Sequence, residues 1–136
     1  MLRVHYYRYD QDYSGWELWI WEKGQEGSLH MFSSQEYLNG DTQKVAKIAE
    51  IDVSGFNSRE IGIIVRRGGW HERDYLFDRY FILSDKAVTE SEDIYLVQDT
   101  AEIFSSIEEL LLSPGFERAV FENFREIFVS LQAPAH

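Results

Sequence analysis

The heptapeptide GWELWIW near the N-terminus is the part of the sequence best suited to contact a ligand. An extended chain alternates its side chains between two faces, so Trp19 and Trp21 share one face of a predicted strand. Trp16, Leu18 and Ile20 share the other face, which we expect to line the core. Residues two apart on a strand are separated by about 7 Å, so the two indoles together span more than one sugar ring.

Paired indoles on one strand face have two interpretations. Indole rings can stack on the apolar C–H faces of pyranose rings, while the sugar hydroxyls stay at the rim to form hydrogen bonds. Aromatic strand residues can equally pack against a second sheet. The strand pattern alone leaves both interpretations open for Trp19 and Trp21.

A further tryptophan, Trp70, follows two glycines in a polar loop. The local pattern offers this indole no core to enter, although it could cap the core from the loop. Polar side chains nearby can exchange hydrogen bonds with hydroxyl groups, and these are His71, Glu72, Arg73, Asp74 and Asp78. The loop therefore predicts a second aromatic and polar contribution to a sugar site.

The sequence shows no catalytic or metal-binding motif. The four histidines share no ligand spacing, cysteine is absent, and neither a GxSxG nor a phosphate-binding glycine motif occurs. Carboxylates are abundant, but no spacing singles out an acid and base pair. We predict a protein with no catalytic residues, metal or cofactor, and a hydrolase that uses two carboxylates stays open as a third possibility.

Length indicates the number of domains, and charge narrows the classes of possible ligand. A chain of 136 residues is the usual size of one domain. Lys plus Arg is 13 and Asp plus Glu is 24, so the net charge of −11 disfavours nucleic acid and anionic membranes. A neutral sugar is unaffected by this charge, and no apolar run approaches the roughly 20 residues of a membrane span.

The hydrophobic pattern predicts an all-β fold. Residues 2–9 and 16–21 alternate and are expected to pair as neighbouring strands, residues 45–53 to form an edge strand, and residues 61–66 to form a buried strand. Further strands are predicted at 79–83 and 94–97, and a strand followed by a short helical turn at 103–112. Short strands separated by turns favour an antiparallel β-sandwich of immunoglobulin-like type. The tail at 116–131 fits a helix or a strand equally well.

Several segments together resemble one known family. These are VHYYRYD at 4–10, DYSGW at 12–16, LWIW at 18–21, IGIIVR at 61–66, DRYFI at 78–82, IYLVQ at 94–98 and EIF at 102–104. In this order and spacing the chain resembles the pullulanase-associated domain, also called carbohydrate-binding module family 41. The resemblance implies a binding module over residues 1–105, with residues 106–136 as a linker and the start of a following domain, including a turn at Asn123, or as a folded-back tail.

The resemblance also implies a function. Such a module binds α-1,4-linked glucan, as in starch, glycogen, pullulan and maltooligosaccharides, without catalysis, and serves the catalytic domains of a pullulanase-type debranching hydrolase in the same polypeptide. Carried over by position, the stacking residues are Trp19, Trp21 and Trp70, and the hydrogen-bonding residues are Asp78 and Arg73. The alternative is a structural or protein-interaction sandwich that binds no sugar. The family implies an extracellular or cell-surface location, whereas a native start at Met1 without a signal peptide implies a cytoplasmic one.

Overall fold

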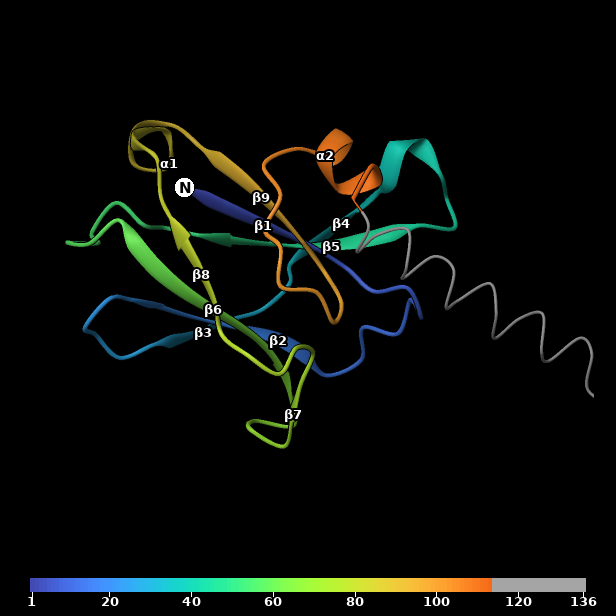
Figure 1. Cartoon of the computed structure of the whole chain (residues 1–136), viewed down its shortest axis with the longest axis horizontal. Helices are drawn as coiled ribbons and strands as arrows, with labels where there is room; N and C mark the ends of the chain where they lie inside the picture. Colours follow the sequence, from blue (N-terminus) through green and yellow to red (C-terminus); the bar gives the residue numbers. More distant parts are fainter. Residues whose placement is uncertain (114–136) are drawn as a thin grey trace, which may run out of the picture.

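The computed structural model describes residues 1–113, which form two stacked β-sheets (Figure 1). Sheet A contains, in spatial order, β4 (Ser34–Tyr37), β5 (Val45–Ile51), β1 (Leu2–Tyr7) and β9 (Glu92–Val97). Sheet B contains β3 (Ser28–His30), β2 (Trp16–Glu22) and β6 (Glu60–Arg67), and both β7 (Glu72–Arg73) and β8 (Arg79–Ile82) pair with β6. The helical segments are η1 (Leu38–Gly40), α1 (Asp85–Thr89) and α2 (Ile107–Leu111).

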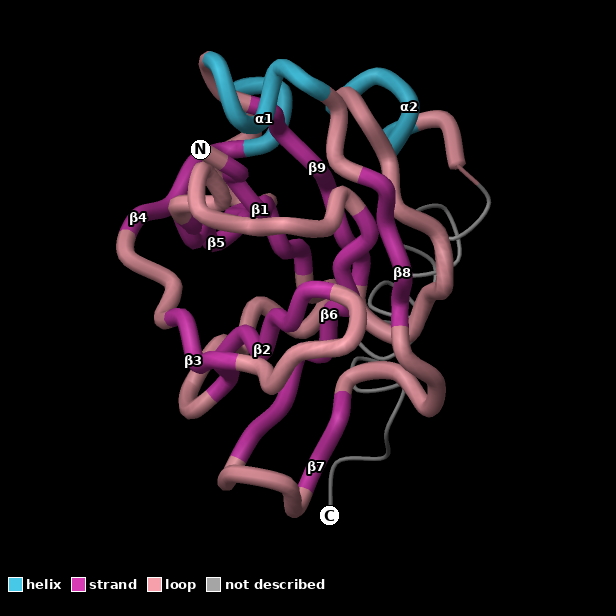
Figure 2. Tube along the Cα trace, turned by 90° about the vertical axis from the view of Figure 1, so that its left-hand side faces the viewer, coloured by secondary structure: helices cyan, strands magenta, loops and turns pink. Residues whose placement is uncertain are grey.

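The core lies between the two layers, which Figure 2 shows one above the other. The long strands send alternate side chains inward, and the largest contributors are at most 6% exposed: Leu2, Val4, Tyr6, Trp16, Leu18, Ile20, Ile61, Ile63 and Val65. Burying one aliphatic side chain of this size stabilises the fold by about 1.5–3 kcal/mol. The predicted core face of the tryptophan-rich strand and the predicted buried strand at 61–66 are both confirmed.

The predicted all-β sandwich is confirmed, whereas two details of its strand arrangement are wrong. Strands β1 and β2 belong to different sheets instead of pairing, because the loop between them is held on sheet A by the side chain of Gln11. Its amide accepts a hydrogen bond from Val45 N–H and donates one to Val45 O, at 2.8 and 3.2 Å. Strand β5 lies inside sheet A, between β4 and β1, and is not an edge. The short polar strand β4 covers that edge and carries no hydrophobic pattern that would reveal it.

One strand pairing differs from the antiparallel rule. β1 pairs antiparallel with β5 and parallel with β9, and the other ladders of the described residues are antiparallel. A parallel pair needs a long connection, and here the whole of sheet B lies between β1 and β9 in the sequence. The first and last long strands, β1 and β9, are therefore neighbours in sheet A.

The outer face of sheet A carries a second, smaller apolar cluster. Its buried members are Tyr7, Leu38, Ala46, Val97 and Leu110. Leu110 comes from α2, whose N-terminus is capped by the Ser106 hydroxyl accepting from Glu109 N–H. Phe104 forms a bridge with Tyr95 just before this helix, in agreement with the strand and helical turn predicted at 103–112. The segment immediately after residue 105 thus packs on the sandwich.

Predictions for the tail fall outside the described residues. The helix or strand expected at 116–131 and the turn expected at Asn123 both lie beyond residue 113. Within residues 1–113, no helix is long and apolar enough to cross a membrane.

Candidate functional site

The outer face of sheet B carries the tryptophans that the sequence singles out. Trp19 and Trp21 alternate with buried Leu18 and Ile20 on β2, so both indoles point away from the core and remain partly exposed. Across the ladder Trp21 lies opposite Gly62 of β6, which in turn lies opposite Tyr80 of β8. Packing of these indoles against sheet A is therefore excluded.

Trp70 reaches the same face from the tip of the turn between β6 and β7. Gly68 and Gly69 both have positive φ values, +64° and +66°, which residues with a Cβ rarely adopt. The reversal that they make places Trp70 beside Trp19, with ring centroids 5.4 Å apart and ring planes at 72°. Trp70 is 57% exposed, so it does not cap the core.

Arg66 holds this indole pair together. Its guanidinium carbon lies 4.6 Å from the ring centroid of Trp19 and 4.3 Å from that of Trp70. The guanidinium is oriented by Glu17, whose Oε1 accepts from Arg66 Nε at 3.1 Å. Each cation–π contact of this kind is worth about 1 kcal/mol or more when partly desolvated, so Arg66 restrains a loop residue against a strand residue. Sequence reasoning placed Arg66 only at the end of a strand and missed this role.

Trp21 rests directly on the backbone of β6. A Cβ at Gly62 would lie 2.1 Å from Cζ2 of Trp21, so only glycine allows the indole to lie against the strand. The edge of this indole faces Tyr80, with ring centroids 6.1 Å apart and planes at 86°. Tyr80 is 60% exposed and is a residue that sequence reasoning did not include. The register of β6 with β8, which sequence alone does not reveal, brings it to the site.

Polar groups border the pair formed by Trp21 and Tyr80. The carboxylate of Asp78 pairs with Arg73 and accepts a hydrogen bond from the Tyr80 hydroxyl at 3.3 Å. The negative charge of Asp78 raises the pKa of the Tyr80 hydroxyl. The Arg73 and Asp78 side chains are each about one-third exposed, at 34% and 33%. Their free hydrogen-bonding capacity therefore faces solvent beside the ring of Tyr80.

Asp74, a polar residue of the loop, is buried and has a structural role. Asp74 accepts two hydrogen bonds from Arg79 at 2.9 and 2.8 Å, and both side chains are 1% exposed. Arg79 also donates to the carbonyl oxygens of Val97 and Thr100. The expectation that Asp74 is available to a ligand is therefore wrong. This buried pair instead fixes the loop that carries Arg73 and Asp78 to the sandwich.

We call the four exposed or half-exposed rings Trp19, Trp21, Trp70 and Tyr80 the aromatic platform. It consists of two edge-to-face pairs, each with its own polar partner: Arg66 for one pair and Asp78 for the other. Aromatic faces bordered by hydrogen-bonding groups suit ligands that combine apolar ring faces with hydroxyls.

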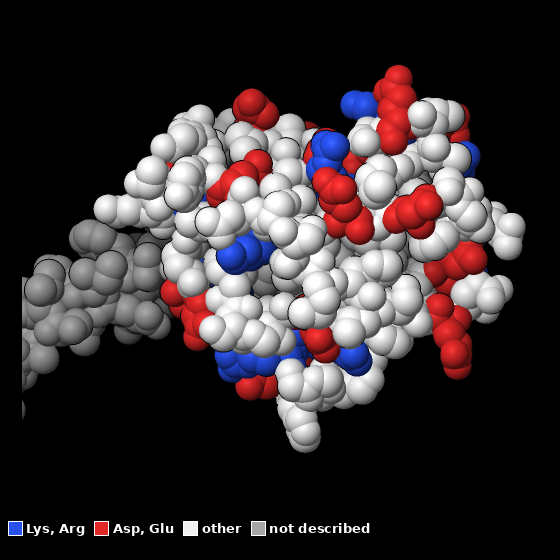
Figure 3. All heavy atoms as spheres, turned by 180° about the vertical axis from the view of Figure 1, so that it is seen from behind, with Lys and Arg blue, Asp and Glu red and all other residues white. Residues whose placement is uncertain are grey.

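Metal or phosphate chemistry has little support in residues 1–113. No group of three or more His, Asp or Glu side chains there is placed to hold a metal ion. On the face drawn in Figure 3, acidic side chains are spread among basic ones, so the described residues of that face offer no extended cationic track for a phosphate backbone.

A known protein family and a solved structure are similar to this chain. Residues 1–105 match the family model described as "Bacterial pullanase-associated domain". Among solved structures, the chain is similar to CBMd, a family CBM41 module from Eubacterium rectale Amy13K, at 26% sequence identity and a TM-score of 0.56. That match covers 77% of this chain and 92% of the other.

Proposed function

Because the chain belongs to the bacterial pullulanase-associated domain family, whose members are accessory carbohydrate-binding modules, we propose that it binds α-1,4-linked glucan through the aromatic platform. The observation that carries this proposal is that Trp19 and Trp21 face outward and lie beside Trp70 and Tyr80. The finer assignments, including Arg73 and Asp78 as hydrogen-bonding residues, are part of the same proposal.

The shape of the platform favours α-linked over β-linked glucose chains. Successive rings of a β-1,4 chain form a flat ribbon, whereas an α-1,4 chain turns at every linkage. The planes of Trp19 and Trp70 stand at 72°, so one flat ribbon cannot stack on both indoles. A curved chain can present one ring to the Trp19 and Trp70 pair and a later ring to Trp21 and Tyr80, with Asp78 and Arg73 binding its hydroxyls.

Binding of this kind supports an enzyme without catalysing a reaction. A module tethered to a catalytic domain raises the local concentration of glucan and leaves the chemical barrier unchanged. Stacking of a few rings must offset the ordering of a flexible ligand, so we expect dissociation constants of about micromolar to millimolar. The proposed partners are therefore α-glucan and the catalytic domains of a pullulanase-type hydrolase.

Calorimetric titration with maltotetraose, with cellotetraose as the control sugar, tests the proposal. We expect saturable binding of the α-linked sugar only, and at least tenfold weaker binding after Trp19→Ala or Trp70→Ala. Tyr37→Ala is the matched control, since Tyr37 is an aromatic residue that is 51% exposed on the other sheet. Equal binding of both sugars, or unchanged affinity in the tryptophan variants, would contradict it.

A second candidate function rests on exposed hydrophobic residues of the loop before β8 and of β8 itself. Leu76, Phe77 and Ile82 are 75%, 64% and 73% exposed, and such side chains suit a protein partner better than a sugar. In this alternative the surface docks on another domain of the same polypeptide. Protection of Trp70 from acrylamide quenching by the adjoining domain, with no effect of maltotetraose, would favour docking over sugar binding.

A further inference from the structure

Two polar residues occupy positions of sheet A that face the other sheet. Lys47 of β5 lies opposite Tyr6, a fully buried core residue, and Gln35 of β4 lies opposite Lys47. Paired residues in a sheet share a face, so both side chains are directed between the layers. Two positions further along β5, Ala49 is fully buried. The hydrophobic pattern of the core therefore stops at Lys47. A local break of this kind is typical of functional or strained sites.

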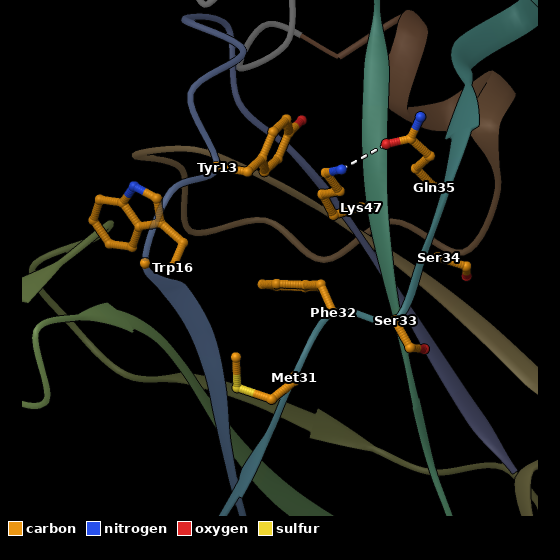
Figure 4. Close-up of a pocket in the computed structure, with 9 residues that line it drawn as sticks. Tyr13, Trp16, Met31, Phe32, Ser33, Ser34, Gln35 and Lys47 are labelled. Carbon is orange, nitrogen blue, oxygen red and sulfur yellow. Dashed lines mark hydrogen bonds between the residues drawn. The ribbon is translucent and has the colours of Figure 1, made fainter.

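A hollow opens between the sheets at this point. It has a volume of about 450 Å³ and lies between Tyr13 and Trp16 on one side and Lys47 and Gln35 on the other, with Phe32 between them (Figure 4). A second hollow of about 580 Å³ continues from it, shares Tyr13, Gln35 and Lys47, and adds Gln11, Asp12 and Ser14. We call the two together the edge cleft. Its size lies within the range of small-ligand sites.

The aromatic side of the edge cleft is held in place before any ligand binds. The Tyr13 hydroxyl accepts from Arg8 N–H at 2.9 Å and donates to Val45 O. Phe32 stacks on the buried ring of Tyr6, with centroids 5.6 Å apart and planes at 13°. A ligand would meet fixed ring surfaces and lose no free energy in ordering them.

The polar side of the cleft can exchange its hydrogen bonds with a ligand. Lys47 Nζ donates to Gln35 Oε1 at 2.5 Å, and this contact is exposed to solvent. Gln35 retains an amide NH₂ donor, and residues Ser33 and Ser34 line the same hollow. Lys47 and Asp12 both line the second hollow, so one positive and one negative charge face the same space. A balanced pair selects for a neutral ligand over an anion or a cation.

From this arrangement we propose that the edge cleft is a second sugar site, which binds a pyranose unit of an α-glucan between Phe32, Tyr13 and the Gln35–Lys47 pair. The choice of α-glucan rests on the function proposed above, whereas the class of neutral pyranose follows from the rings, donors and charges of the cleft. Rings and hydroxyl-binding groups face each other across a space of one or two sugar units.

The edge cleft and the aromatic platform cannot share a sugar ring. Trp16 lines the cleft from the core face of β2, while Trp19 and Trp21 lie on the opposite face of the same strand. A short oligosaccharide therefore occupies one site at a time. A long glucan can reach both, and engagement of two sites raises its apparent affinity without new contacts at either one.

Amide chemical-shift mapping with maltotetraose tests this proposal on the full chain. In a Trp19→Ala/Trp70→Ala variant, which removes one of the two ring pairs of the platform, we expect maltotetraose still to shift amides 13–16, 31–35 and 47 in a saturable way. Adding Gln35→Ala/Lys47→Ala is expected to weaken the affinity that these shifts report at least tenfold. Introduced into the otherwise unaltered protein, the same two changes should leave the shifts at the platform unchanged. Lys23→Ala, which removes an exposed lysine outside the cleft, is the control.

The outcomes separate this proposal from the previous one. Saturable shifts confined to the platform would overturn the second site and support the first. Shifts confined to the edge cleft would support the second site and overturn the platform. No saturable shift at either site in a protein with dispersed amide signals would overturn both.

Discussion

The indole of Trp70 meets that of Trp19 edge to face, although one belongs to a turn and the other to a central strand of sheet B. The contact depends on two positive-φ glycines that reverse the chain and on the guanidinium of Arg66, which lies against both rings. A turn residue would otherwise sample many positions, and ordering it on binding would lower affinity. Arg66 therefore preorganises the proposed platform.

Replacement of Arg66 is expected to weaken glucan binding without removing a stacking ring. Arg66→Ala removes two cation–π contacts of about 1 kcal/mol each, so we expect about three- to tenfold weaker binding of maltotetraose by calorimetry and faster acrylamide quenching of Trp70. Arg66→Lys keeps the charge and should recover part of the affinity. Identical quenching in Arg66→Ala and the unaltered protein would show that Trp70 is held by other contacts.

A methyl group at Gly62 is expected to displace Trp21. In Gly62→Ala the new Cβ would lie 2.1 Å from the indole, which must move off the strand. We expect at least tenfold weaker binding of maltotetraose with little change in the thermal unfolding midpoint, because Trp21 is on the outer face. Gly55→Ala is the matched control, since a Cβ there meets nothing within 4 Å. Equal affinities of the two variants would contradict a role for Trp21.

The buried Asp74–Arg79 pair is expected to dominate the stability of the binding loop. Asp74→Asn leaves a buried guanidinium without its counter-charge, which costs about 3–5 kcal/mol in the free energy of unfolding. The partly exposed pair of Arg73 with Asp78 provides a contrast, because Asp78→Asn should cost less than about 1 kcal/mol. Urea denaturation of both variants measures the difference. Similar losses in the two would mean that the buried pair adds no more than a surface pair.

Alkaline pH is expected to destabilise the fold through its tyrosines. Burial raises the pKa of Tyr7 to about 12, raises that of Tyr95 to about 12, and also raises the pKa values of Tyr6 and Tyr13. Each folded-state pKa lies above the unfolded value near 10, so the folded protein retains protons that the unfolded chain releases. The stability contributed is fully present below pH 10 and is lost as pH rises from 10 towards 12.

Urea denaturation at pH 9, 10 and 11, together with tyrosinate absorbance, checks this expectation. We expect an unchanged free energy of unfolding up to pH 9 and a steady fall above pH 10. Tyrosinate formation should lag behind that of a denatured control. A free energy of unfolding that stays constant up to pH 11 would mean that these hydroxyls titrate equally in both states.

Some features of the site could be predicted from local pattern. Strand alternation places Trp19 and Trp21 on one face because the period of two depends only on backbone geometry. Alternation cannot tell whether that face turns towards the other sheet or towards solvent. Only the arrangement of the two sheets shows that Trp19 and Trp21 lie on the outer face. Tyr80 was missed for a related reason: it reaches Trp21 only because β8 pairs with β6, a long-range choice.

The same contrast applies to charged side chains. The sequence around Arg66 does not reveal that its guanidinium contacts two indoles. The sequence around Asp74 and Arg79 likewise does not reveal that they form a buried ion pair. The identity of the partner decides the role, and each partner lies on another segment. Gln35 and Lys47 likewise become neighbours only through the pairing of β4 with β5.

The sequence by itself determined that this protein is an all-β sandwich with two tryptophans on one face of a strand and belongs to a family of carbohydrate-binding modules, since alternation, turn residues and motif order are local properties of the chain. Only the tertiary structure decided that β1 and β2 lie in different sheets, that Arg66 clamps Trp70 on Trp19, and that a cleft opens beside Lys47. The physical reason is that contacts between distant segments depend on strand order and register. Many strand orders satisfy the same hydrophobic alternation, and they are separated only by the packing of the complete fold.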